Sequence, residues 1–226
     1  MNELLFFLHI FVLIMFLLVS VKISKEALIV FVCLQTILAN LFVTKQMELF
    51  SFTVTCSDVY VVSAIFGLNL LQEYFGKKEA QKTIYYSLIF LLLFMVVAKI
   101  HVLYMPSIVD TTQSSFCKIF ESTPRIIIAS IAVFFVVQWF DMLLYSALKK
   151  RYNKNTLLIR MLTSSVLSQF IDTVLFSFLG LYLIVDKIFD VILVSFAVKL
   201  ITIISCSFFI GFTNKLLRVK KADELL

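Results

Sequence analysis

The chain has 226 residues, of which 62% are hydrophobic and 15% charged, and its formal net charge at pH 7 is +6. Soluble domains are about half apolar and a quarter charged, so this composition excludes a soluble domain and indicates an integral membrane protein. The basic residues fall in short segments between apolar runs, where they act as topology signals. We therefore expect the lipid bilayer as a partner and no nucleic acid.

Seven apolar runs have a length that suits a membrane-spanning helix. Crossing a hydrocarbon core of about 30 Å takes roughly 20 residues, and in lipid such a run satisfies its own backbone only as a helix. The predicted helices cover residues 4–21, 27–44, 52–71, 83–104, 126–147, 158–183 and 190–213. The sequence predicts an all-α fold, a polytopic membrane helical bundle of about seven transmembrane helices that forms a single membrane domain over residues 1–226.

The first run, residues 4–21, is predicted to be a retained helix. Its leading residues are Met-Asn-Glu, without a positive charge, and no small-residue cleavage site follows, so it lacks the features of a cleaved signal peptide.

The distribution of Lys and Arg orients the predicted bundle. One side receives thirteen of these residues and the other receives four. Basic loops stay in the cytoplasm, so we predict the N-terminus outside and the C-terminus inside, with residues 214–226 as a basic cytoplasmic tail. Residues 105–124, which contain both prolines, would then lie outside, either as a lid over an entrance or as a plain connector.

Polar residues inside the predicted helices are the candidate site, because ionisable side chains in the hydrocarbon usually face a bundle interior or a wet cavity. They are Gln35, Asn40, Asp58, Asn69, Lys99, His101, Gln138, Asp141, Gln169, Asp172 and Lys199. At about 1.5 Å per residue, Asp172 and Lys199 each lie roughly 15 Å from the outer ends of their helices. We therefore expect them to form a buried ion pair.

A short pattern occurs twice, as QWFDMLLYS at residues 138–146 and within SQFIDTVLFSF at residues 168–178. Residues three apart share one face of a helix, so each copy presents an amide and a carboxylate together. If the two helices face each other, they line a cavity with two carboxylates, two amides and the aromatic residues Trp139, Phe170 and Phe176. The alternative is that these groups form interhelical hydrogen bonds that only hold the bundle together, at about 1 kcal/mol or less each.

Signatures of enzymes and metal sites are missing from the sequence. It contains no P-loop, no HExxH and no GxSxG, it has two histidines, and its four cysteines form no CxxC pair. We expect no enzymatic activity, no metal and no cofactor.

Several stretches in order resemble the queuosine-precursor transporter family, also called the VUT family. They are LANLFVTK at residues 38–45, GLNLLQEYFGKKEA at 67–80, and the positions Arg125, Ser130, Gln138, Asp141, Gln169, Asp172, Thr173 and Lys199. The resemblance covers residues 27–213 and leaves residues 1–21 as an extra N-terminal helix. The chain departs from the family at Leu68 and Asn69, where many relatives have Thr-Asp.

The resemblance implies a six-helix core similar to the substrate-binding subunit of vitamin transporters. It also implies import of 7-deazaguanine bases (queuine, preQ1 or preQ0) across the cell inner membrane for tRNA modification. A carboxylate at Asp172 or Asp141 would accept both N–H donors of the guanine-type edge, and Lys199 or a glutamine would donate to its carbonyl. The predicted substrate-binding residues are Asn40, Asn69, Gln138, Trp139, Asp141, Gln169, Phe170, Asp172 and Lys199.

Two other functions remain open at this point. One is import of another small heterocycle or vitamin with the help of an ATPase partner, and the other is a non-transporting membrane scaffold. The sequence also leaves open whether the chain forms a homo-oligomer or works with an energising partner.

Overall fold

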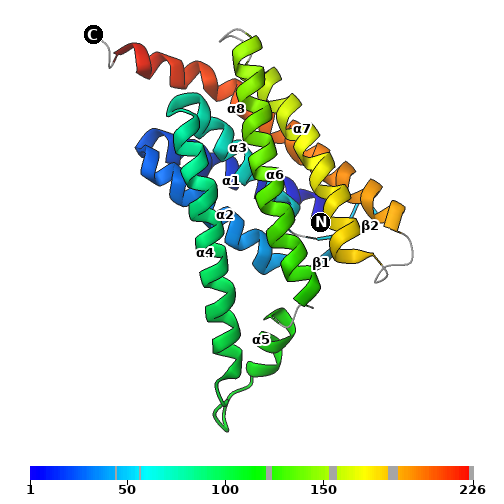
Figure 1. Cartoon of the computed structure of the whole chain (residues 1–226). Coiled ribbons are helices and arrows are strands. Elements are labelled where there is room, and N and C mark those ends of the chain that lie inside the picture. Colours follow the sequence, from blue (N-terminus) through cyan, green and yellow to red (C-terminus); the bar gives the residue numbers. More distant parts are fainter. Residues whose placement is uncertain (44, 56, 121–123, 153–156, 183–187, 224–226) are drawn as a thin grey trace.

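The computed structural model describes residues 1–226 except 44, 56, 121–123, 153–156, 183–187 and 224–226 (Figure 1). The elements in chain order are α1 (Asn2–Ile23), α2 (Lys25–Phe42), β1 (Gln46–Leu49), β2 (Phe52–Thr55), α3 (Asp58–Tyr74), α4 (Lys77–Leu103), α5 (Gln113–Phe120), α6 (Pro124–Arg151), α7 (Leu157–Phe176), the π-helical turn η2 (Ser177–Leu181) and α8 (Ile188–Asp223). The all-α polytopic membrane bundle is confirmed, since its seven long helices correspond to the seven predicted ones.

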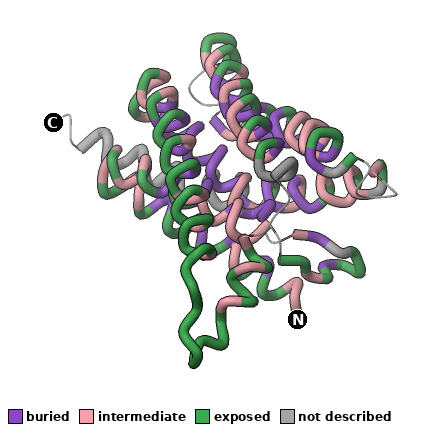
Figure 2. Tube along the Cα trace, turned by 60° about the horizontal axis from the view of Figure 1, so that its bottom comes forward, coloured by how far each residue is buried: buried purple, intermediate pink, exposed green. Residues whose placement is uncertain are grey.

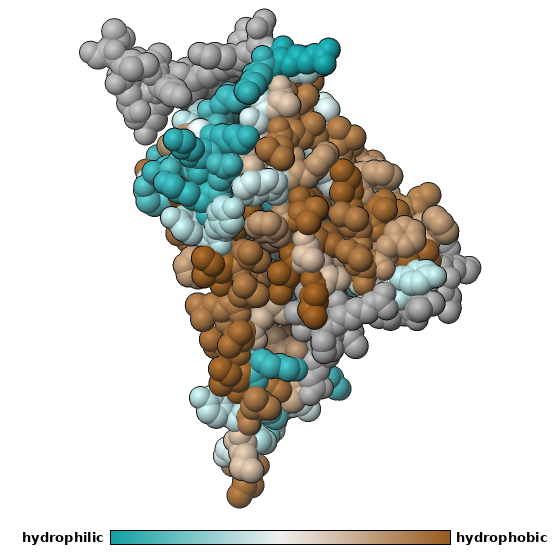
Figure 3. Space-filling model, in the orientation of Figure 1, coloured by the Kyte–Doolittle hydropathy of each residue, from teal (hydrophilic) through white to brown (hydrophobic). Residues whose placement is uncertain are grey.

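Within the described residues, five helices are individually long and apolar enough to cross a membrane: α1, α2, α4, α6 and α7. Apolar side chains on the outer face of α4, such as Leu93, Val97 and Ile100, are exposed, as expected for contact with lipid. Figure 3 shows this apolar surface between hydrophilic patches at the two ends of the bundle. The larger patch lies at the end where α4 begins and α6 ends, with Lys77, Lys149 and Arg151, and we call it the basic end.

Helix α3 is the centre of the bundle. It contacts α1, α2, α4, α6, α7 and α8, and every residue from Val62 to Gln72 is buried (Figure 2). A helix enclosed on all sides needs a mostly apolar surface all round, and in this stretch of α3 only Ser63, Asn69 and Gln72 are polar. Gly67 lets α2 approach closely, because a Cβ at this position would lie 2.5 Å from Cγ2 of Val32.

The predicted helix over residues 52–71 is wrong at its start, because residues 46–55 form a β-hairpin. Strands β1 and β2 pair antiparallel, with Gln46 opposite Thr55 and Leu49 opposite Phe52. Phe50 and Ser51 both have positive φ, 50° and 67°, as the two central residues of a type I′ turn require. Hydropathy alone missed the hairpin, because Phe52 and Val54 extend the apolar run of the helix that follows.

The hairpin is attached to the start of α1. The Asn2 side chain donates a hydrogen bond to the carbonyl oxygen of Glu48 (2.8 Å), and the backbone N–H of Phe50 donates to Oε1 of Glu3 (3.3 Å). These bonds hold the hairpin at the end of the bundle opposite the basic end. As a consequence, α3 begins at Asp58 and this acidic residue lies in its first turn.

Three other predicted boundaries change. Residues 113–120 of the predicted outer segment form α5, whose Gln113 donates to the carbonyl oxygen of Val102 in α4 (2.8 Å). Helix α7 ends at Phe176, its continuation to Leu181 is π-helical, and residue 183 of the prediction lies outside the described residues. Helix α8 continues through most of the predicted tail, to Asp223.

Candidate functional site

A cavity of about 140 Å³ lies in the half of the bundle opposite the basic end. Its polar and aromatic lining residues are Thr36, Asn40, Thr55, Ser57, Asp58, Ser130, Phe134, Asp172, Thr173, Phe176, Ser177, Ser195 and Lys199. The cavity lies in this half because the last turns of α2 and α7 and the first turn of α3, which contribute to its wall, all lie there. One water takes about 30 Å³ in the liquid, so the cavity has room for roughly five waters or a small bicyclic molecule.

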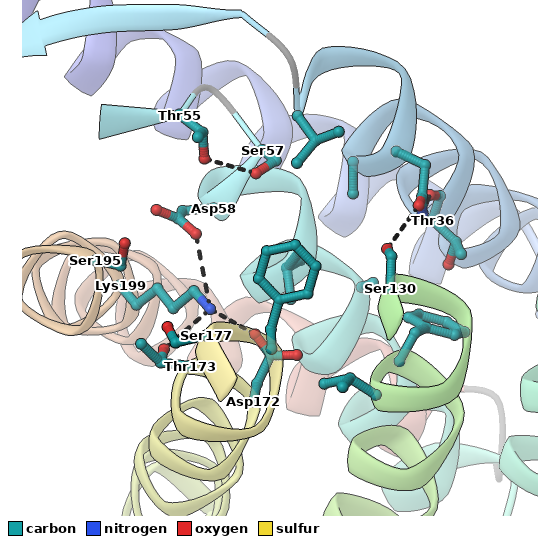
Figure 4. Close-up of a pocket in the computed structure, with 18 of the residues that line it drawn as sticks. Thr36, Thr55, Ser57, Asp58, Ser130, Asp172, Thr173, Ser177, Ser195 and Lys199 are labelled. Carbon is teal, nitrogen blue, oxygen red and sulfur yellow. Dashed lines mark hydrogen bonds and ion pairs between the residues drawn. The ribbon is translucent and has the colours of Figure 1, made fainter. Parts of the chain in front are cut away.

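The Lys199 ammonium group is the electrostatic centre of the cavity (Figure 4). Its Nζ donates to Oδ2 of Asp172 at 2.5 Å and to Oγ1 of Thr173 at 3.1 Å, and it lies 3.7 Å from Oδ1 of Asp58. The predicted ion pair between Asp172 and Lys199 is confirmed. Lys199 is only 5% exposed, and a lysine so deeply buried is stable when carboxylates compensate its charge.

Asp58 was not among the predicted substrate-binding residues. It was predicted to be a polar residue inside a helix, and with the helix start misplaced nothing indicated that its side chain lies beside Lys199. The signal that finds it is the alternation of Thr53, Val54 and Thr55, which indicates a strand and moves the helix start to Asp58. The serine and threonine residues of the lining give no such signal, because a hydroxyl group can bond its own helix, as Thr36 and Thr173 do with the carbonyl oxygens of Val32 (3.0 Å) and Gln169 (2.8 Å).

Among the described residues, Asp58, Asp172 and Lys199 are the charged residues that line the cavity, and together they carry a net charge of −1 when all are ionised. Oδ2 of Asp58 is buried and has no hydrogen-bond partner within the described part of the chain. The cavity therefore offers a free acceptor and an excess of negative charge. Both favour a ligand with N–H donors or a positive charge.

Asn40 lies on the α2 side of the cavity, as predicted. Its side-chain oxygen accepts a hydrogen bond from the Ser130 hydroxyl (2.8 Å), and its amide donates to the carbonyl oxygen of Thr36 (3.0 Å). These two bonds hold the Asn40 amide in one orientation across the interface between α2 and α6.

Four of the predicted residues lie elsewhere, in a second buried cluster between α3, α6 and α7. This polar cluster consists of Asn69, Gln138, Asp141, Ser164, Ser168 and Gln169, all 0–1% exposed. Oδ1 of Asp141 accepts hydrogen bonds from Ser164 (2.5 Å) and Ser168 (2.8 Å). The expectation of one cavity lined by both repeated motifs is wrong, and whether these residues bind substrate stays a prediction.

Antiparallel packing explains why the two motifs separate. Asp141 of α6 lies opposite Ser164 and Ser168 of α7, and in this register Gln138 lies at the level of Gln169. The carboxylates, three residues beyond each glutamine, then point toward opposite ends of the bundle. At about 1.5 Å per residue, Asp141 and Asp172 differ in depth by roughly 9 Å.

The predicted aromatic residues are also divided between places. Phe176 lines the cavity, whereas Trp139 packs on Tyr85 of α4 (5.8 Å between ring centroids) and Phe170 is 48% exposed beside Phe196. Phe134 lines the cavity and was missed, because one phenylalanine among the 25 of this chain carries no distinguishing signal.

An ion cluster closes the bundle at the basic end. Glu73, at the end of α3, lies 3.1 Å from Arg160 of α7 and 3.3 Å from Lys149 of α6, and it accepts a hydrogen bond from the Tyr145 hydroxyl (3.0 Å). Lys149 also donates to the backbone carbonyl oxygens of Gln72 and Glu73, both at 3.0 Å, as basic residues often do at the end of a helix. The cluster therefore joins α3, α6 and α7 on the side away from the cavity.

A membrane bundle with a charged cavity of this size has the construction of a small-molecule transporter, and comparison with known proteins agrees. Residues 49–213 match the family model described as putative vitamin uptake transporter. A curated relative, the probable queuosine precursor transporter of Bacillus subtilis (strain 168), is 32% identical over 187 residues, which are 80% of this chain and 82% of the relative. No solved structure matches.

The chain belongs to the putative vitamin uptake transporter family, in agreement with the resemblance found in the sequence. It is accordingly a multi-pass membrane transporter and not an enzyme.

Removing Glu73 tests the ion cluster. Glu73→Gln leaves the Arg160 guanidinium, 1% exposed, without its carboxylate, which we expect to reduce the free energy of unfolding by about 3 kcal/mol or more. The measurement is denaturant or thermal unfolding of the purified protein in detergent.

The matched control is Glu79→Gln, which removes ion pairs with Lys25 and Lys82 near the surface and should lower the free energy of unfolding far less than Glu73→Gln does. The double variant Glu73→Gln with Arg160→Met should recover most of the loss, because no buried charge then remains unpaired. A Glu73→Gln protein that unfolds like wild type would contradict a structural role for the cluster.

Proposed function

We propose that this protein imports queuosine precursors, bases of the 7-deazaguanine type, and binds them in the cavity beside Lys199. The observation that carries the proposal is the group formed by Lys199, Asp172 and Asp58 in a cavity of small-molecule size within a family of uptake transporters. The name of the Bacillus subtilis relative supports the substrate class.

The chemistry of the cavity suits a guanine-type edge, which has two N–H donors and one carbonyl acceptor. In the proposed complex the free Oδ2 of Asp58 accepts from the donors, and the Lys199 ammonium donates to the carbonyl. Phe134 and Phe176 are placed to stack on the ring, a contact worth about 1 to 3 kcal/mol per base in proteins that bind nucleobases.

The direction of transport follows from the proposed topology in the inner membrane. If the basic end faces the cytoplasm, the cavity lies in the outer half of the membrane and the Glu73 cluster closes the inner half. The conformation is then one in which substrate enters from outside. Release would require α3, α6 and α7 to separate at the cluster.

Complementation tests the proposed import. A bacterium that lacks both queuosine synthesis and its own importer, given the chain and a low concentration of one base, should regain queuosine in its tRNA. Asp172→Asn should reduce the queuosine content of the tRNA at least tenfold at equal membrane abundance. The substitution removes the carboxylate that holds the Lys199 ammonium group in the cavity, and a charge-assisted hydrogen bond is worth about 1.5 to 3 kcal/mol.

The control for complementation is Asp110→Asn, which removes an exposed carboxylate that accepts hydrogen bonds from Thr112 in an outer loop, and it should retain full activity. If the protein is present in the membrane at normal abundance and the tRNA contains no queuosine with any of the three bases, the proposal is overturned.

The net negative charge of the cavity predicts a preference among the bases. PreQ1 carries an aminomethyl group that is protonated at neutral pH, whereas preQ0 carries a neutral nitrile, so we expect preQ1 to bind roughly tenfold more tightly. The measurement is equilibrium binding of each base to the purified protein. Asp58→Asn should abolish the difference, and equal affinities for wild type would contradict it.

A further inference from the structure

We propose that the Asp141 side chain is a proton-binding site, separate from the cavity, and that it is protonated in this conformation. The part of this proposal in which Asp141 couples transport to protons rests on the proposed function. Its protonation is a property of the protein alone and can be measured without any substrate.

The surroundings of Asp141 show why its charge is costly. The side chain is 0% exposed at the middle of the bundle, and two serine hydroxyls donate to one of its oxygens. The other oxygen, Oδ2, has no hydrogen-bond partner in the described part of the chain. Hydrogen bonds from neutral groups offset only part of the several kcal/mol that an ion loses when it leaves water.

No cation in the described residues compensates Asp141. The titratable groups that face this region are Tyr85 on α4, Tyr145 and Lys149 on α6, Glu73 on α3 and Arg160 on α7, and η2 contributes none. Lys149 and Arg160 are both engaged by Glu73. Asp172, by contrast, has Lys199 beside it, so of the two carboxylates in the repeated motifs only Asp141 lacks a counter-charge.

The neighbours of Asp141 can accept the hydrogen bond that its carboxyl group would donate when protonated. The side-chain oxygens of Asn69, Gln138 and Gln169 are all buried and, within the described residues, without a hydrogen-bond partner. Asn69 lies beside Asp141, and Gln138 is one helical turn away on the same face. A proton on Oδ2 of Asp141 becomes a donor for one of these oxygens, so a single proton removes both the buried charge and two unsatisfied groups.

The same glutamines lie between the level of Asp141 and the level of the cavity. Gln169 lies one turn from Asp172, its backbone carbonyl accepts a hydrogen bond from Thr173, and Thr173 in turn contacts Lys199. The Gln169 side chain makes no hydrogen bond within the described residues, so a proton from the cavity would reach Asp141 through water admitted between these side chains. It would leave on the other side when the ion cluster at Glu73 opens, which returns Asp141 to the carboxylate.

Infrared spectroscopy of the purified protein tests the protonation directly. A protonated carboxyl group gives a C=O stretching band that shifts in D₂O. The difference spectrum between wild type and Asp141→Asn should contain this band, whereas the difference spectrum between wild type and Asp172→Asn should lack it. If wild type and Asp141→Asn show the same carboxyl bands, Asp141 is ionised and the proposal is wrong.

A second variant keeps the test decisive if Asp141→Asn does not fold. Replacing Ser164 and Ser168 together by alanine removes both donors to the Asp141 carboxyl group. The band should then move to higher frequency, because its C=O loses hydrogen bonds. An unchanged band would show that the proton is on another group.

Transport in proteoliposomes separates the coupling role from the substrate. Uptake of preQ1 should rise several-fold when the outside is made more acidic than the inside, and it should lose this response in Asp141→Asn. Uptake that is equal with and without the gradient overturns the coupling role alone. No uptake of any 7-deazaguanine base overturns the proposed function, while the infrared result stands.

Discussion

The buried ammonium group of Lys199 is the constraint on which the rest of the site depends. An uncompensated charge at this depth costs several kcal/mol, so the fold must bring carboxylates to it from other helices. Asp172 comes from α7, and Asp58 comes from the first turn of α3, which the β-hairpin holds in place. The polar cavity exists because three helices meet at one charge and leave space beside it.

Helix α3 connects this charge with the opposite end of the bundle. Asp58 stands at its first turn and Glu73 at its last, about 22 Å apart at 1.5 Å per residue. Each end contributes a carboxylate to a group of ions shared with α7, through Asp172 at one end and Arg160 at the other. A movement of α3 against α7 would therefore disturb both groups, which gives the cavity and the closed end a physical connection.

Much of this arrangement could be predicted from the sequence. Apolar length gave the seven helices, and equal depth of Asp172 and Lys199 gave their ion pair, because the cost of a lone charge in lipid leaves few other arrangements. The register between helices could not be predicted, because hydropathy does not show which faces of two helices are in contact. For that reason Asp141 was expected beside Asp172 and is found in a separate cluster, opposite two serines.

The β-hairpin and Asp58 were missed for a local reason. Phe52 and Val54 make residues 52–57 look like the start of the apolar helix that follows. The strand signal depends on a few β-branched residues and on a turn formed by Phe50 and Ser51, without glycine. Because the start of α3 was predicted six residues too early, Asp58 was not predicted to lie beside Lys199 and Asp172.

In the proposed transporter the cavity beside Lys199 faces the outside and holds the substrate, and thiol labelling of the cavity wall tests both properties. Ser195→Cys places a single cysteine on the cavity wall once Cys33, Cys56, Cys117 and Cys206 have been replaced. In intact cells a membrane-impermeant thiol reagent should label it, and preQ1 should protect it, while a matched Ser164→Cys in the buried cluster stays unlabelled. Labelling of Ser195→Cys only from the cytoplasmic side, or labelling that no 7-deazaguanine base prevents, would contradict the account.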